Sequence, residues 1–410
     1  QKICKKTLVI IPKFRDKTLK STLGSIGFVN IKELREEVKF SIKNVNIEMV
    51  IEDGFNDRDS AIILDNGQSK IINLNDCHPS FEKIKKYSKN TDILLLQCSS
   101  AIWWPCVYDY SHEELIKKCS QKRKNVLNRA LQYAKHIDPK CVIPNAGPPV
   151  FLNDQFNFWD KTRKEDYNPF PLHDDIHEFY KSNNISSCFV IPGSKVVITP
   201  EKIINHTDID ERNRIYGDLG SYLKDLKNKK TLRNDLSNSL LPSGRDLSNL
   251  VPKFKSLIKI IREQSKIFIH KINFPVLIEF SSHSKWIIDF SLDPEECFER
   301  FDEQSYIYAF EFDPQIVSML IDRERIDFDE YFLSMRFKCS RREDIFNEFL
   351  FTMFKNLDIK SFLLSENIYL TNSVGDKDDL ETFVVDFGHC KKRIQKFCPH
   401  KGVDLEKCGI

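Results

Sequence analysis

The sequence predicts a mixed fold, α/β and α+β, in which a layered domain precedes a smaller module. Two patterns predict it. Strand-like and helix-like segments alternate through residues 8–144, and a helix, three strands and further helices follow in residues 252–354. Hydrophobic residues make up 41% of the 410 residues and charged residues 30%, which is typical of globular proteins and excludes a disordered chain.

The first segment predicts a sheet layered with helices. Asn66-Gly67 lies between two apolar runs and is a strong hairpin signal. Apolar residues recur at helical spacing over 113–137, the clearest helix of the chain. We expect strands at 8–12, 28–31, 48–52, 60–64, 70–76, 92–97 and 141–144, and a short helix at 17–24.

The middle of the chain is richer in loops. A short helix is expected at 174–182 and a hairpin over 187–198, around Pro192-Gly193. Residues 200–250 are dense in charge and low in apolar content, so we expect a domain boundary there.

The last segment predicts a compact α+β module and a group of short strands. The module has helices at 252–270, 313–321, 327–334 and 343–354, and strands at 276–280, 286–290 and 306–312. Short strands are expected at 362–364, 382–385 and 393–395. The predicted boundaries are 1–200 for the first domain, 201–251 for a charged linker or insertion, 252–360 for the module and 361–410 for the last domain.

Charge and cysteine usage limit the environment and the partners. Lys plus Arg number 62 and Asp plus Glu 60, so bulk positive charge does not draw this chain to nucleic acid. The longest apolar stretch, 93–107, is interrupted by Gln97 and two serines and is too short to span a membrane. The 12 cysteines lack a disulfide-like spacing and no apolar leader precedes them, so we expect free thiols in a reducing cytoplasm.

A cysteine and a histidine form the sharpest motif, Cys398-Pro399-His400-Lys401-Gly402, which ends in Val403-Asp404-Leu405. It resembles the first half of a Rieske site, in which two Cys bind one iron of a [2Fe–2S] cluster and two His bind the other. The resemblance assigns Cys398 and His400 as cluster ligands. The second Cys-x-x-His pair is expected outside this chain; the alternative is a degenerate fold without a cluster.

Several acids lie near predicted strand ends. Asp53, Asp57 and Asp59 follow or precede strands, and Asp76 ends one, next to Cys77-His78. Carboxylate and imidazole ligands suit non-haem iron, manganese or zinc, and open α/β sheets bind ligands at such ends. The alternative is that these acids cap loops.

Two histidines share a helix face, since His173 and His177 are four residues apart. They could share a metal ion, with Asp174 and Asp175 orienting the imidazoles. The alternative is a helix start with capping aspartates and two surface histidines. The run from Gln97 to Pro105 offers small residues and two Trp for a substrate pocket or simply for core packing, and Cys98 has no obvious base that would make it a nucleophile.

Longer strings resemble the metallo-β-lactamase-fold part of the CMP-N-acetylneuraminate hydroxylase family. They are Glu52-Asp53-Gly54, residues 59–64 and 70–77, Trp104-Pro105, residues 144–147, 286–290 and 327–337. The resemblance implies a metallo-β-lactamase-like αββα sandwich with its N-terminal part missing, and the start of a C-terminal all-β Rieske domain.

The resemblance also has departures. The family's His-x-His-x-Asp-His motif does not occur in this sequence, the Rieske motif comes last rather than first, and Asn56 stands where the family has a His. Asp76 matches a carboxylate ligand of the family, and Asp53 and Asp59 match acids of its Asp-Gly loop.

The resemblance therefore implies a Rieske-dependent non-haem oxygenase that hydroxylates a small molecule, such as an N-acyl sugar or an amine. It implies a [2Fe–2S] cluster, mononuclear or dinuclear iron with zinc as an option, and an electron-donating reductase or ferredoxin. The candidate metal ligands are Asp53, Asp59 and Asp76 from these strings and, from their spacing on one helix, His173 and His177. The alternatives are a metal-dependent hydrolase of the same fold, which needs neither O2 nor reductant, and a non-catalytic binding module.

Overall fold

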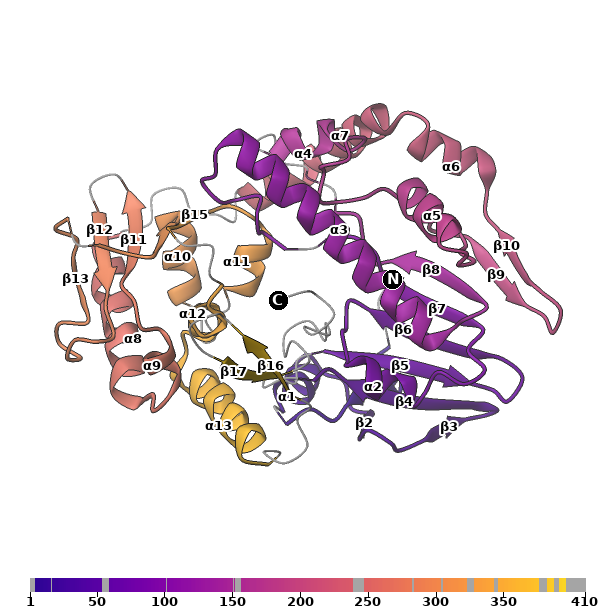
Figure 1. Ribbon diagram of the computed structural model, residues 1–410, viewed down its shortest axis with the longest axis horizontal. Helices are drawn as coiled ribbons and strands as arrows, with labels where there is room; N and C mark the ends of the chain where they lie inside the picture. The colour runs from indigo at the N-terminus through magenta and orange to yellow at the C-terminus, as the bar shows by residue number, and fades with distance from the viewer. Residues whose placement is uncertain are drawn as a thin grey trace. The chain divides into compact units, whose positions relative to one another are not determined.

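The computed structural model describes residues 4–15, 17–53, 59–100, 102–149, 151, 156–238, 247–281, 284–303, 305–322, 328–342, 346–375, 382–386 and 391–395. The chain forms two compact units. Unit 1 comprises residues 1–100, 123–224 and 372–410, and unit 2 comprises residues 101–122 and 225–371. Both units combine helices with sheets (Figure 1), so the predicted α/β and α+β fold class is confirmed. The predicted domain boundaries remain predictions.

A six-stranded sheet forms the centre of unit 1, in the order β3-β4-β5-β6-β7-β8. Strands β3 to β6 are antiparallel, while β6, β7 and β8 run parallel. The predicted Asn66-Gly67 turn joins β5 to β6, and Gly67 has the positive φ of 81° that such a turn needs. The strands are β3 (Phe40–Ile42), β4 (Val45–Ile51), β5 (Ser60–Asp65), β6 (Lys70–Asn75), β7 (Ile93–Gln97) and β8 (Cys141–Asn145).

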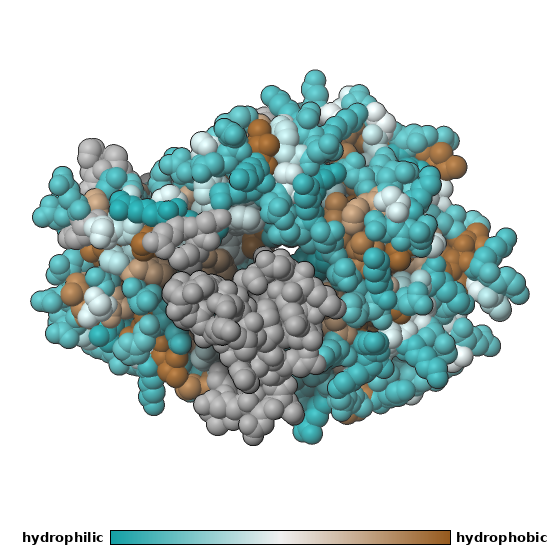
Figure 2. Space-filling view, viewed as in Figure 1, coloured by the Kyte–Doolittle hydropathy of each residue, from teal (hydrophilic) through white to brown (hydrophobic). Residues whose placement is uncertain are grey.

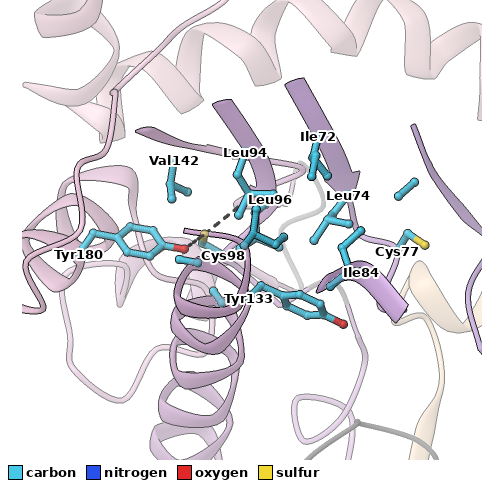
Figure 3. Close-up of a cluster of buried hydrophobic side chains, with 14 of the residues drawn as sticks. Ile72, Leu74, Cys77, Ile84, Leu94, Leu96, Cys98, Tyr133, Val142 and Tyr180 are labelled. Atoms are coloured by element: carbon cyan, nitrogen blue, oxygen red, sulfur yellow. Dashed lines mark hydrogen bonds between the residues drawn. The ribbon is translucent and has the colours of Figure 1, made fainter. Parts of the chain in front are cut away.

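Each face of this sheet is covered. Helices α2 (Phe81–Lys85), α3 (His112–Ile137) and α5 (His173–Ser182) contribute buried side chains to one cluster with Ile72 and Leu94 (Figure 3). Ile63 belongs to the same cluster. The opposite face of β4 and β5 packs against β1 (Val9–Pro12) and β2 (Ile31–Leu34). The alternation of side chains along β5 therefore places Ile63 on the helical face and Ile62 on the other.

The remaining elements of unit 1 correct two predictions. The strand expected at 28–31 begins at Ile31 as β2, which pairs in parallel with β1. The hairpin expected over 187–198 lies further along the chain, because β9 pairs with β10 across a turn in which Thr199 binds Lys202. The elements are α1 (Thr18–Ser25), α4 (Asn157–Lys161), β9 (Lys195–Ile198), β10 (Ile203–His206), α6 (Ile209–Tyr216), β16 (Thr382–Asp386) and β17 (Lys391–Gln395); α7 (Leu219–Asn238) follows α6.

Unit 2 contains a five-stranded sheet in the order β13-β12-β11-β14-β15 with an aromatic core. Phe310 of β14 lies within ring-stacking or edge distance of Phe332, Phe351 and Phe354. The elements are β11 (Val276–Ser281), β12 (Ser284–Ile288), β13 (Phe298–Arg300), β14 (Tyr308–Glu311), β15 (Lys338–Arg341), α8 (Leu250–Gln264), α9 (Phe268–Lys271), α10 (Pro314–Ile321), α11 (Asp329–Leu333), α12 (Glu348–Lys355) and α13 (Ile359–Gly375).

The strand predicted at 362–364 is wrong, because these residues lie in α13. Phe362, Ser365 and Glu366 are all buried, and positions three and four apart share one face of a helix. The helix predicted at 252–270 is divided in two, since α8 ends at Gln264.

No helix in the described ranges is long and apolar enough to cross a bilayer. Hydrophilic side chains predominate on the face seen in Figure 2, with apolar side chains in scattered patches.

Candidate functional site

The candidate site lies at one edge of the six-stranded sheet. Strand β4 is antiparallel to β5 and β5 to β6, so β4 runs in the same direction as β6, β7 and β8. Their carboxyl ends therefore meet at one edge, together with the start of β5. We call this the carboxyl edge; it brings together the termini that carry Glu52, Asp53, Asp59, Asp76, Ser99 and Asn145. Open sheets with parallel strands bind ligands at such an edge.

Four carboxylates at the carboxyl edge interact electrostatically. Burial, and next the negative charge of Asp59, raise the pKa of Glu52 from 4.5 to about 7, with Asp53 and Asp76 adding to the rise. Burial and the charge of Asp76 raise the pKa of Asp59 to about 6, against the Ser60 N–H that donates to it at 2.7 Å. These groups can therefore exchange protons near neutral pH.

Glu52 is held by the segment after β6. The backbone N–H of His78 donates to Oε1 of Glu52 at 3.1 Å, and Nδ1 of His78 lies 3.8 Å from the same oxygen. The His78 ring stacks on Tyr133, with centroids 6.2 Å apart. A carboxylate and an imidazole thus lie side by side at this edge.

Asp53 is engaged by helix α2 instead. It accepts hydrogen bonds from the Ser80 backbone N–H at 2.5 Å and from Nζ of Lys83 at 3.1 Å. Lys83 also contacts Glu36 at 2.9 Å and donates to the carbonyl of Ile51 at 2.8 Å. These contacts give Asp53 a structural role at the start of α2.

Helix α3 supplies two groups that the sequence interpretation missed. Tyr133 donates to the carbonyl of Pro79 at 2.6 Å. Burial lowers the pKa of Arg129, while Tyr133 and Glu52 favour its charged form, so the guanidinium lies within electrostatic reach of the acids. The available signal was the spacing of four residues, which puts Arg129 and Tyr133 on one side of a helix.

Buried polar atoms lie at the end of β8 and just after β7. Within the described part of the chain, Oγ of Ser99, Oγ of Ser100 and Oδ1 of Asn145 have no hydrogen-bond partner. Buried polar groups ordinarily have partners, so these atoms are available to a bound polar group.

The predicted pocket run from Gln97 to Pro105 is divided between the units, because unit 2 begins at Ala101. Cys98 is a core thiol, as its Sγ lies 3.2 Å from the hydroxyl of Tyr180 (Figure 3). Burial raises the pKa of Cys98 to about 12, which agrees with the prediction that it is not a nucleophile.

The two helical histidines have separate partners. Nδ1 of His173 lies 3.2 Å from the Tyr216 hydroxyl, and its ring packs edge-on against Phe189. Nδ1 of His177 lies 2.8 Å from Oγ of Ser187. Both imidazoles connect α5 to the chain that follows it, and their role as metal ligands remains a prediction.

No group of three or more His, Cys, Asp or Glu side chains within the described ranges is arranged to hold a metal ion. The residues described at the carboxyl edge therefore do not by themselves make a complete metal site. Cys398, His400 and Asp57 lie outside the described residues; strands β16 and β17 form a hairpin just before the Cys398 motif.

Comparison with known proteins gives relatives over nearly the whole chain. Residues 250–371 match the family model for the Rv3818-like, SCP2-like domain. A Mycobacterium tuberculosis protein named as a Rieske 2Fe-2S iron–sulfur protein is 25% identical over 426 aligned residues, which cover 99% of this chain and 79% of that protein. A protein of the same description from Mycolicibacterium smegmatis is 24% identical, with equal coverage.

Similarity to solved structures is partial. The diiron β-hydroxylase CmlA from Streptomyces venezuelae aligns with 12% identity and a TM-score of 0.31, over 44% of this chain and 38% of that one. The metallo-β-lactamase-fold protein YhfI from Bacillus subtilis aligns with 10% identity and a TM-score of 0.26, over 44% and 62% of the two chains.

Proposed function

We propose that this chain is part of a Rieske-type iron–sulfur oxidoreductase that hydroxylates a small polar molecule. The observation that carries the proposal is the agreement of two features. Relatives that match 99% of the chain are named Rieske 2Fe-2S proteins, and the chain holds the Cys398-Pro399-His400 string. The alignment covers 99% of this chain, so the similarity extends well beyond that string.

In this proposal Cys398 and His400 supply two of the four cluster ligands, one to each iron. A bound Rieske cluster relays single electrons, so a reductase or a ferredoxin would be the donor. The metallo-β-lactamase-like arrangement of unit 1 and the kinship with CMP-N-acetylneuraminate hydroxylases belong to the same proposal.

The carboxyl edge would be the surface that faces the substrate. Glu52, beside His78, would hold or release a proton, while Arg129 would attract a polar or negatively charged group. Ser99 and Asn145 would bind an amide or a hydroxyl, which suits an N-acyl sugar or an amine. Because the described acids do not complete a metal site, no step through a catalytic metal is assigned to them.

The test is cluster content in the full-length protein, produced with iron and sulfide. We expect acid-labile sulfide together with at least an equal amount of iron, and a Rieske-type EPR signal after anaerobic reduction. The variant Cys398→Ser should lose the acid-labile sulfide and the EPR signal, and Cys4→Ser, which changes an exposed cysteine, should keep both. Iron-loaded protein without this signal would refute the proposal, and substrate turnover without O2 or reductant would favour the metal-dependent hydrolase instead.

A further inference from the structure

Two cysteines far apart in the sequence meet in unit 1. Cys141 begins β8, and the segment 186–188 runs parallel to it, with a bridge between Val142 and Ser187. The N–H of Cys188 donates to the carbonyl of Val142 at 2.9 Å, and the N–H of Val142 donates to Ser186 at 2.9 Å. This pairing fixes both backbones and brings the two sulfur atoms to 2.9 Å from each other.

The two thiols differ in environment. Cys141 is 1% exposed, whereas Cys188 is partly exposed. The S–H of Cys141 donates to Cys188, which lowers the pKa of Cys188 from 9.0 to about 7 although burial opposes the change. The same bond and burial raise the pKa of Cys141. Cys188 is thus suited to act as the thiolate and Cys141 as the protonated partner.

We propose that Cys141 and Cys188 form a redox-active dithiol that closes to a disulfide when it meets a hydroperoxide. The thiolate of Cys188 attacks the outer peroxide oxygen, the O–O bond breaks, and the alkoxide or hydroxide leaves and takes up a proton. The resulting sulfenic acid of Cys188 is attacked by the sulfur of Cys141, which forms the S–S bond and releases water. Two thiols and one hydroperoxide give one disulfide, one water and one alcohol or water.

Other described cysteines lack this combination. Cys77 and Cys98 are buried, and burial raises the pKa of each thiol. Cys106 lies beside Cys119, but burial is the main cause that raises its pKa well above the usual value. Of the described thiols, Cys188 is the one whose pKa is lowered while its side chain stays partly exposed.

The disulfide would tie β8 to the segment 186–188, in which Oγ of Ser187, the neighbour of Cys188, contacts Nδ1 of His177. This inference depends neither on the cluster nor on the hydroxylase activity, so either can fail without the other.

The first test uses the wild-type chain. It is treated with equimolar hydrogen peroxide, blocked with N-ethylmaleimide and digested without reductant. We expect a linked peptide pair that contains Cys141 and Cys188, lighter by two hydrogen atoms than the sum of the separate peptides. Cys188→Ser should abolish the pair, and Cys4→Ser should leave it unchanged. Oxidation of Cys188 to sulfinic acid without the pair, or both thiols remaining free, would overturn the proposal.

The second test measures the hydrogen bond between the thiols. In Cys141→Ala the pKa of Cys188 should rise toward 9.0, which cuts its thiolate fraction at pH 7 from about one half to about one in a hundred. The greater nucleophilicity of a more basic thiolate offsets part of this, so iodoacetamide should alkylate Cys188 about five- to eightfold more slowly. Cys297→Ala, which removes a buried thiol of unit 2, should not alter the rate. An unchanged rate in a folded Cys141→Ala variant counts against the proposal, and the wild-type mapping stays decisive if that variant does not fold.

Discussion

Glu366 of α13 is a buried carboxylate whose removal should destabilise unit 2. Its side chain is 3% exposed. It accepts a hydrogen bond from Oγ of Ser265 at 2.7 Å and bonds from the backbone N–H groups of Lys266, Ile267 and Phe268 at 3.1, 2.7 and 2.8 Å. Burial raises the pKa of Glu366, but these donors together outweigh it and hold the pKa below its ordinary value of 4.5.

The expected loss follows from these donors. In Glu366→Ala the N–H groups of Ile267 and Phe268 lose their acceptor, at a cost of about 1–3 kcal/mol each, and a cavity adds to it. We expect a total of about 3–5 kcal/mol. Glu366→Gln retains one acceptor oxygen but turns an amide NH2 toward the donors, so about 2–3 kcal/mol is expected. The folded pKa is depressed, so this stability is present above about pH 4.5 and is lost as the pH falls through the folded pKa.

Urea unfolding of the full chain, followed by tryptophan fluorescence at pH 7 and pH 3.5, measures the loss of stability in each variant and its dependence on pH. Glu296→Gln makes the same change on an exposed glutamate of unit 2 and should alter the free energy of unfolding by less than about 0.5 kcal/mol. A Glu366→Gln variant that matches this control at pH 7, or whose loss of stability does not shrink on acidification, would exclude this role of the Glu366 carboxylate.

Three further predictions concern unit 1, each measured by urea unfolding. The pKa of Glu52 is raised from 4.5 to about 7, so wild-type stability falls as the pH rises between those values. Glu52→Gln should therefore add about 1–2 kcal/mol to the free energy of unfolding at pH 8 and nothing at pH 4; the gain is this small because the Glu52 side chain is 30% exposed. An equal gain in the exposed control Glu82→Gln would contradict this. Lys83→Met leaves Asp53 and Glu36 without their shared cation and should cost about 1–2 kcal/mol at pH 7, whereas Lys85→Met, exposed on the same helix, should cost little. Gly147→Ala would put a Cβ 2.8 Å from Cβ of Ser99, at a φ of +152°, and should cost about 2–4 kcal/mol of stability. The control Gly193→Ala, also at positive φ but in open space, should cost only about 1 kcal/mol. Equal losses in the two variants would exclude the steric explanation.

Local patterns predict much of this fold. The hairpin at Asn66-Gly67 and helix α3 depend on turn chemistry and on periodicity within one segment, and both are found. The strand predicted at 362–364 fails because a three-residue apolar run has no period of its own. In the helix that these residues form instead, Glu366 accepts hydrogen bonds from donors about a hundred residues earlier in the sequence. No local pattern carries that information.

The candidate site, like the fold, can be predicted from the sequence only where local patterns determine it. Acids next to strands can be predicted to meet at a sheet edge, and Asp53, Asp59 and Asp76 do lie at adjacent termini. The shared helix face of His173 and His177 can be predicted too, but not that Tyr216 and Ser187 bind them separately. Those partners come from folding of the following chain, and sequence spacing does not report it.

At the carboxyl edge, Lys83 contacts some of the acids and not others, and this difference decides which acid is suited to proton transfer. Lys83 donates to Asp53 and contacts Glu36, so its charge is used where α2 begins. Glu52 has Asp59, Asp53 and Asp76 among its neighbours, and their charges and its burial oppose its ionisation. The sequence pattern points to Asp53 as the functional acid, because it precedes a glycine in the loop, whereas the electrostatic environment points to Glu52. In the function proposed above, the acid–base role at this edge would therefore fall to Glu52, while Asp53 contacts Ser80 and Lys83 at the start of α2.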